Sequence, residues 1–206
     1  ENGIIAAQLA RLGYEADRNA LDGRWGHFQV TRGGCDPERI LGRLGNPYTL
    51  SWPGVSVKPY PCGSLSHPSM DTLLDLLTEN DVKPEEVAEI RLGAGDNILN
   101  PLRYQEPQNE LEAKFSLQFC LAILVLRRRA GVQEFTDEVV RSQEVREMMT
   151  LVKTYRSPEI EAKGSDRMRS LVEIRLKNGK SLSREAETSR GTPERPMGHD
   201  GMAAKF

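Results

Sequence analysis

The stretch LVEIRLKNGKSLSREAE, residues 171–187, alternates apolar and charged side chains and then carries a tight-turn signal. Every second residue from Val172 to Leu176 is apolar, as in a strand with one buried face. Asn178-Gly179 is a dipeptide that two-residue hairpin turns favour, because both turn positions need a positive φ. These residues therefore predict an antiparallel β-hairpin.

Helices and further strands are predicted around this hairpin. Residues 85–95 (EEVAEIRLGAG) alternate as a half-buried strand does, and residues 152–157 (VKTYRS) predict another strand. Helical spacing of apolar residues predicts helices over 68–80 and 110–130, and two short helices within 135–152. We therefore expect an α+β fold, a two-layer α/β sandwich with a small, largely antiparallel sheet, in preference to a doubly wound parallel one.

Several of these helices carry recognisable end signals. Three arginines close the segment 110–130, and Gly131 is expected to supply its left-handed C-cap. Thr136 and Ser142 are expected to cap the two short helices that follow.

The N-terminal part of the chain predicts only helices. ENGIIAAQLARLG predicts a helix over residues 3–12, and DPERILGRLG predicts a brief helix that starts at the N-cap Asp36. Residues 46–66 are rich in Pro, Gly, Ser and aromatics, with one short strand expected near 55–58.

This change of composition marks a predicted domain boundary. We assign residues 1–50 to the end of an all-helical domain and residues 51–206 to an α+β domain. The chain opens without an initiator methionine or a signal peptide, and a new helical pattern (Met202, Ala203, Phe206) begins at its last residues. We therefore expect further sequence on both sides.

Composition argues against several classes of protein. Hydrophobic residues make up 38% and charged residues 28% of the 206 residues, as in ordinary folded domains. A formal net charge of -2 predicts no nucleic-acid partner, and the apolar run 115–126 is too short to span a membrane. Cys35, Cys62 and Cys120 are widely spaced, which favours reduced thiols in the cytoplasm and argues against a metal site.

One loop combines residues that suit acid–base chemistry. In KPYPCGSLSHPSMDTLLDLL, residues 58–77, His67 stands just before Pro68 at a helix start, which attracts carboxylates and favours an uncharged imidazole. Such an imidazole suits proton transfer next to a substrate carboxylate, with Lys58 holding a second carboxylate. The plainer interpretation is that Ser66 caps the helix while His67 and Lys58 are solvated. On the residues alone, the plainer interpretation is favoured.

The same loop resembles the K-R-[FY]-P-[SAC]-C-x-x-[ST]-H-P segment of the MmgE/PrpD family. This family includes 2-methylcitrate dehydratase, cis-aconitate decarboxylase and iminodisuccinate epimerase. Four further stretches resemble family motifs in the same order: NGIIAAQLARLGYEADRNALDGRWGHF, EAKFSLQFCLAILVLRRRAGVQEFTDEVVRSQEVREMM, LKNGKSLS and GTPERPM. The resemblance covers nearly the whole chain.

The resemblance implies a lyase or isomerase of small di- or tricarboxylates, which works without a cofactor and tends to form homodimers. It implies a helical domain joined to an α+β lid. His67 matches the family's catalytic lid histidine, and Lys58 and Ser66 fall at substrate-binding positions. Pro59 stands where the family usually has arginine, so one cation is missing.

Two function classes remain open at this point. The family's other catalytic residues belong to segments that would precede Glu1, so this chain alone is expected to be inactive. The alternative to a lyase or isomerase is a non-catalytic α+β binding module that kept the fold.

Overall fold

The computed structural model describes residues 1–203 and 205. The chain divides into two compact units, Glu1–Pro53 and Gly54–Phe206. The first unit ends at Pro53, where the sequence predicted a boundary after residue 50. That the first unit is the end of a larger helical domain stays a prediction.

The first unit contains three short helices, which are α1 (Asn2–Arg11), α2 (His27–Arg32) and α3 (Pro37–Leu41). Asp36 caps α3 as predicted, because its carboxylate accepts a hydrogen bond from the Glu38 N–H. None of the three helices has a buried residue, and Trp25 between them is 80% exposed. Helices gain most of their stability from packing an apolar face, so this unit adds little to the stability of the chain.

The second unit is built on a four-stranded sheet with the order β2-β1-β3-β4. The strands are β1 (Val87–Ala94), β2 (Val152–Arg156), β3 (Ser170–Leu176) and β4 (Ser181–Ala186). The predicted hairpin is confirmed: β3 pairs antiparallel with β4, and Gly179 takes a φ of 87° in the turn. The pair β1–β3 is also antiparallel, whereas β1–β2 is parallel. The α+β fold class is therefore confirmed.

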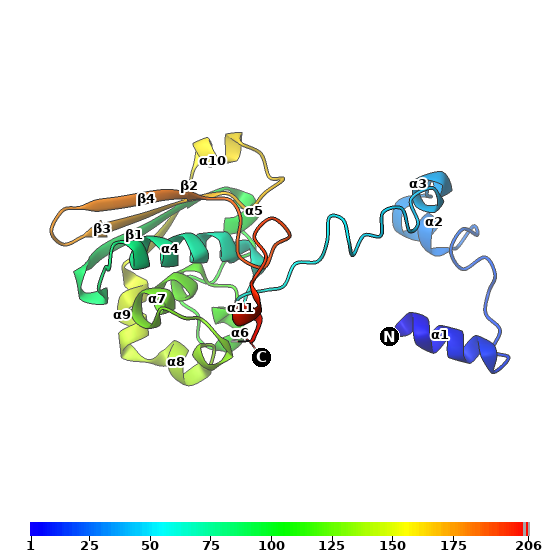
Figure 1. Cartoon of the computed structure of the whole chain (residues 1–206), viewed down its shortest axis with the longest axis horizontal. Helices are drawn as coiled ribbons and strands as arrows, with labels where there is room; N and C mark the ends of the chain where they lie inside the picture. The colour runs from blue at the N-terminus through cyan, green and yellow to red at the C-terminus, as the bar shows by residue number, and fades with distance from the viewer. Residues whose placement is uncertain (204, 206) are drawn as a thin grey trace. The chain divides into compact units, whose positions relative to one another are not determined.

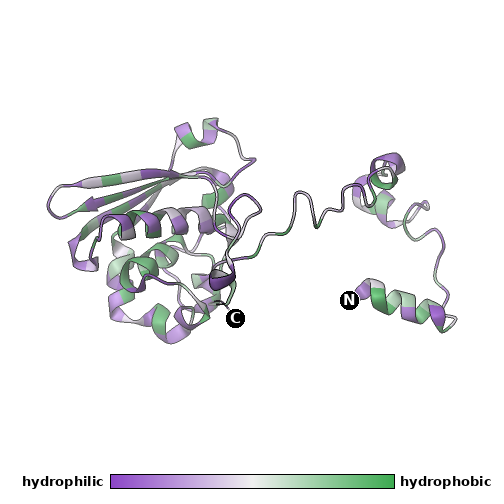
Figure 2. Cartoon of the chain, in the orientation of Figure 1, coloured by the Kyte–Doolittle hydropathy of each residue, from purple (hydrophilic) through white to green (hydrophobic). Residues whose placement is uncertain are grey.

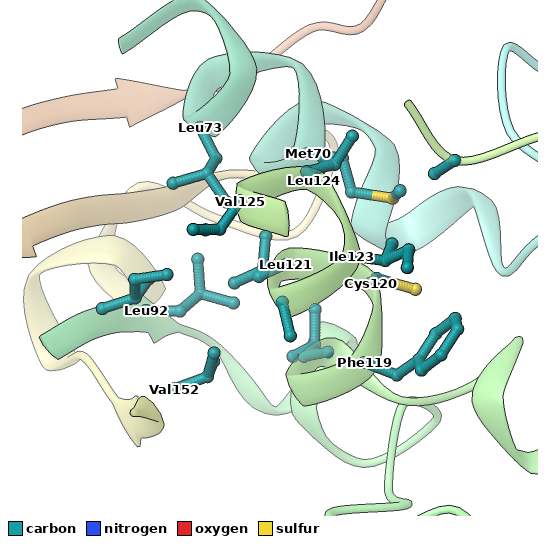
Figure 3. Packing of buried hydrophobic residues seen from close by; sticks show 14 of the residues in the cluster. Met70, Leu73, Leu92, Phe119, Cys120, Leu121, Ile123, Leu124, Val125 and Val152 are labelled. Atoms are coloured by element: carbon teal, nitrogen blue, oxygen red, sulfur yellow. The ribbon is translucent and has the colours of Figure 1, made fainter. Parts of the chain in front are cut away.

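Helices α4 (His67–Glu79) and α7 (Leu117–Arg127) lie on one face of this sheet (Figure 1). Figure 2 shows α4 with hydrophobic bands between hydrophilic ones, as an amphipathic surface helix has. Helix α7 is buried along most of its length, because it packs against α4 on one side and α9 on the other. In Figure 3, Leu121 and Val125 of α7 point toward Leu92 of β1 and Leu73 of α4, which forms the centre of the core.

The remaining elements are short and connect these layers. They are η1 (Ser64–Ser66), η2 (Pro84–Glu86), α5 (Asp96–Leu99), α6 (Glu110–Ala113), η3 (Val132–Glu134), α8 (Asp137–Arg141), α9 (Gln143–Thr150), α10 (Pro158–Ala162) and α11 (His199–Ala203). Phe206, part of the predicted C-terminal helical pattern, lies outside the described residues. In the described chain, the longest apolar helices are too short to cross a membrane.

The single helix predicted over residues 110–130 is wrong in two respects. Helix α6 stops at Ala113, and α7 begins only after Ser116, whose hydroxyl caps it by accepting from the Phe119 N–H. The left-handed C-cap is Arg128 and not Gly131. Arg128 holds this conformation while its guanidinium donates to the Val82 carbonyl.

Two smaller predictions also need correction. Residues 55–58 do not form a strand; Val57 makes a single backbone hydrogen bond to the Gly191 carbonyl instead. Thr136 caps α8 as predicted, but Ser142 turns its hydroxyl back to the Val139 carbonyl and caps nothing with its side chain.

Candidate functional site

A cavity of about 480 Å³ opens at the start of α4. Three segments that are distant in sequence line it: the loop before α4, the segment just before β3, and the loop after β4. Its side chains include His67, the three cations Lys58, Arg167 and Arg190, and the three carboxylates Asp166, Glu187 and Glu194. The second unit alone therefore brings the predicted histidine and lysine to one cavity.

His67 is the first residue of α4, and it is only 2% exposed. Its ring meets the Tyr60 ring edge-on, with 5.4 Å between the centroids. Within the described residues, its Nε2 atom is buried and has no hydrogen-bond partner. The interpretation of His67 as a solvated residue is therefore wrong. An orphaned buried nitrogen costs folding free energy, about 1–3 kcal/mol, and a catalytic role is one of the reasons for which such an atom is retained.

Ser66 lies beneath His67 among sulfur atoms. It is fully buried, and its hydroxyl donates to the Gly63 carbonyl at 2.8 Å and lies 3.3 Å from the Met70 sulfur. It makes no side-chain cap of α4. A contact between Ser66 and a substrate stays a prediction, and it would require the hydroxyl to leave these partners.

Cys62 and Cys120 are buried thiols in the same region. Contact with Cys120 lowers the pKa of the Cys62 thiol, burial opposes this, and the nearby His67 lowers it further. The pKa of Cys120 is raised by its contact with Cys62 and by burial. Cys62 is 3% exposed, and its sulfur packs against Ser66 and the Met70 sulfur.

Lys58 lies on the exposed rim of the cavity. Its ammonium group donates to the Cys62 carbonyl at 3.2 Å. Among the described residues it has no carboxylate partner, whereas Arg167 lies 3.7 Å from Glu187. Lys58 therefore brings to the cavity an ammonium group that forms no ion pair within the described residues.

Asp71 organises the wall of the cavity one turn after His67. Its side chain is 1% exposed and accepts three hydrogen bonds. The donors are the Tyr60 hydroxyl at 2.5 Å, the backbone N–H of Arg190 at 2.6 Å and the guanidinium Nε of Arg190 at 3.0 Å. Arg190 Nη2 in turn donates to the Tyr60 oxygen at 2.8 Å. Burial and the charge of Asp71 raise the pKa of Tyr60, so its hydroxyl stays protonated as a donor. Asp71 and Tyr60 together hold the Arg190 guanidinium at the cavity.

A glycine allows the loops that carry Lys58 and Arg190 to meet. Gly191 has a φ of 83°, and an added Cβ would collide with the Val57 carbonyl oxygen. The Gly191 carbonyl accepts the Val57 N–H at 2.7 Å, which ties the loop after β4 to the loop before α4. Close backbone approach at this glycine therefore positions both cations.

Sequence reasoning missed Asp71 and Arg190. The spacing of His67 and Asp71 was an available signal, because residues four apart share one face of a helix. Arg190 carries no local signal, since its partner Asp71 is far away in the sequence and only the folded chain brings them together.

The arrangement suits a small anion with several carboxylate groups. Cations with one or more free donors recognise carboxylates, and a buried imidazole can pass a proton at close range. No group of three or more potential metal ligands occurs within residues 1–203 and 205.

Comparison with known families agrees with the motifs in the sequence. The model of the MmgE/PrpD C-terminal domain matches residues 60–206, which is most of the chain. The chain belongs to the MmgE/PrpD family. The matched region begins at Tyr60 and includes His67, Asp71 and Arg190.

Curated MmgE/PrpD relatives match over the whole chain. The chain is 22% identical to a cis-aconitate decarboxylase of Aspergillus terreus and 24% identical to a cis-aconitate decarboxylase of Mus musculus. Both alignments cover 100% of this chain but only 45% and 43% of the relatives. The chain therefore spans less than half the length of these relatives.

Proposed function

We propose that this chain is part of a lyase or isomerase of small di- or tricarboxylates, in which His67 transfers a proton. The observation that carries the proposal is that His67, whose Nε2 is buried and unpartnered within the described residues, lines a cavity together with Lys58 and Arg190. Membership in the MmgE/PrpD family and the names of the two relatives support it.

The reaction needs one proton moved at a carbon next to a carboxylate. In a decarboxylation, the bond to the departing carboxylate breaks, its electron pair forms a new double bond, and a proton is added to the former alkene carbon. In a dehydration, a base removes the proton and hydroxide leaves with a second proton. His67 can serve either step, as acid or as base, because imidazole exchanges protons near neutral pH.

Lys58 and Arg190 hold the substrate in this account. Pro59 lacks the cation that the family motif has at that position, and Arg190 supplies a positive group to the same cavity from a different loop. Binding through two cations orients the reacting carbon toward His67 and excludes monocarboxylates. We propose that further catalytic groups come from outside these residues and that the whole enzyme is a cytoplasmic homodimer.

The direct test is an assay of the full-length protein with cis-aconitate, 2-methylcitrate and iminodisuccinate, with products identified by proton NMR. We expect one of the three to be converted.

Arg190→Gln should raise KM by about tenfold to a hundredfold with a smaller change in kcat, because it removes a charge-assisted hydrogen bond to a carboxylate.

Arg184→Gln is the matched control, since Arg184 of β4 forms an exposed pair with Glu79 of α4. It should leave KM unchanged. If the folded protein binds these carboxylates but converts none of them, the non-catalytic module becomes the better account.

A further inference from the structure

A second cavity, of about 380 Å³, lies at the outer edge of the sheet and shares no lining residue with the His67 cavity. Its walls are the segment 105–108, the first turn of α7, the end of α9 and the edge strand β2. Most of its lining is polar and able to hydrogen-bond, and the volume is that of a site for a small molecule.

The edge strand turns the backbone groups of Thr154 toward this cavity. In the parallel pair, Ile90 N–H donates to the Leu151 carbonyl, so the backbone groups of Lys153 point toward β1. The N–H and carbonyl groups of Thr154 therefore point to the outer edge, which the cavity occupies, whereas the Val152 N–H is taken up by the Met149 carbonyl at the end of α9.

Gln118 is the second observation that points to a ligand. It lies in the first turn of α7 and is 7% exposed, and its Oε1 is buried without a hydrogen-bond partner among the described residues. Its Nε2 makes a long contact of 3.4 Å with the Thr154 hydroxyl. The wall of the cavity thus contains an amide acceptor that the protein itself leaves unpaired.

The charged side chains at this cavity favour an anionic ligand that also carries a hydrogen-bond donor. Arg146 and Lys153 line it, with Glu106 as the acidic member. Within the described residues none of these three side chains forms an ion pair. The Arg146 guanidinium donates only to Gln108 Oε1, at 3.3 Å. Gln108 is itself fixed, because its N–H donates to Glu112 and its carbonyl accepts from Arg141.

We propose that this cavity binds a small α-hydroxy or α-amino carboxylate, separately from the His67 site. Arg146 and Lys153 receive the carboxylate groups, and the hydroxyl or ammonium group of the ligand donates to Gln118 Oε1. The amide, the two cations and the free edge of β2 supply complementary groups to such a molecule, whereas a plain hydrocarbon would leave all of them unpaired.

Calorimetric titration of the full-length protein with L-malate, L-aspartate and succinate tests this site. Malate or aspartate should bind at least about tenfold more tightly than succinate, which lacks the donor at the second carbon. Lys153→Gln and Arg146→Gln should each weaken binding by about tenfold or more. Lys177→Gln, an exposed lysine at the end of the hairpin, is the matched control and should change nothing.

Gln118→Met separates a binding role from a structural one. The variant removes the unpaired amide at nearly constant volume, so the melting temperature should be maintained or rise while the preference over succinate disappears. A lower melting temperature with the preference intact overturns the proposal, as does the absence of saturable binding by all three probes. If Arg190→Gln abolishes binding and Lys153→Gln does not, the probes occupy the His67 cavity. In that case this inference fails while the proposed function stands.

Discussion

His67→Gln should lower kcat of the full-length enzyme by about a hundredfold or more, the usual contribution of a positioned acid or base. The glutamine amide can fill the buried space of the imidazole but cannot accept and release a proton near neutral pH. Because substrate binding depends on Lys58 and Arg190, KM should change much less than kcat. Steady-state kinetics with the substrate that the parent enzyme converts gives both values.

Two checks separate this effect from damage to the fold. His199→Gln removes a fully exposed histidine and should leave kcat at the parent value. The melting temperature of His67→Gln should stay near that of the parent, because the His67 Nε2 atom makes no hydrogen bond within the described residues. A variant of His67 with undiminished kcat would show that the histidine has no chemical role.

Asp71→Ala should reduce the free energy of unfolding by about 1–3 kcal/mol, the range for leaving a buried hydrogen-bonding group without its partner. The carboxylate is 1% exposed and accepts three hydrogen bonds, so its loss leaves the Tyr60 hydroxyl without its acceptor and the half-buried Arg190 guanidinium without its counter-ion. Chemical denaturation of the chain measures the change. Carboxylate binding should weaken in parallel, because Arg190 is no longer held at the cavity.

The double variant Asp71→Ala with Arg190→Ala tests whether the two act as a unit. Its destabilisation should be clearly smaller than the sum of the single effects, since the second change removes the charge that the first leaves unpaired. Glu79→Ala, which breaks the exposed pair with Arg184, should leave the free energy of unfolding nearly unchanged. Additive effects at Asp71 and Arg190 would mean that the buried pair does not organise the cavity.

The sequence predicted best those parts of the fold that depend on local signals. The hairpin around Gly179 and the amphipathic helix α4 both follow from patterns within a few residues of each other. The parallel pairing of β1 with β2 could not be read in this way, because Ile90 and Val152 meet only through tertiary packing. The helix break before Ser116 was missed because the apolar pattern continues through it, although the serine is itself a capping signal.

In the candidate site, too, residues within one local motif could be predicted and a residue brought in by tertiary packing could not. His67 and Lys58 belong to one motif, so a resemblance to a family could single them out from the sequence. Arg190 joins them only because α4 binds the loop after β4 through Asp71, and Arg195 with Asp75 adds a second tie at 3.2 Å. Sequence spacing does not reveal such long-range pairs. The sequence therefore could not predict that Arg190 supplies the cation that is absent at Pro59.

The most direct test of the central claim is a nitrogen NMR titration of the full-length protein with propane-1,2,3-tricarboxylate, an unreactive tricarboxylate. If His67 and Arg190 line the substrate site, the imidazole resonances of His67 and the Nε resonance of Arg190 shift together and saturably, while those of the exposed His199 do not move. Saturable binding that leaves the His67 and Arg190 resonances unchanged would contradict the account.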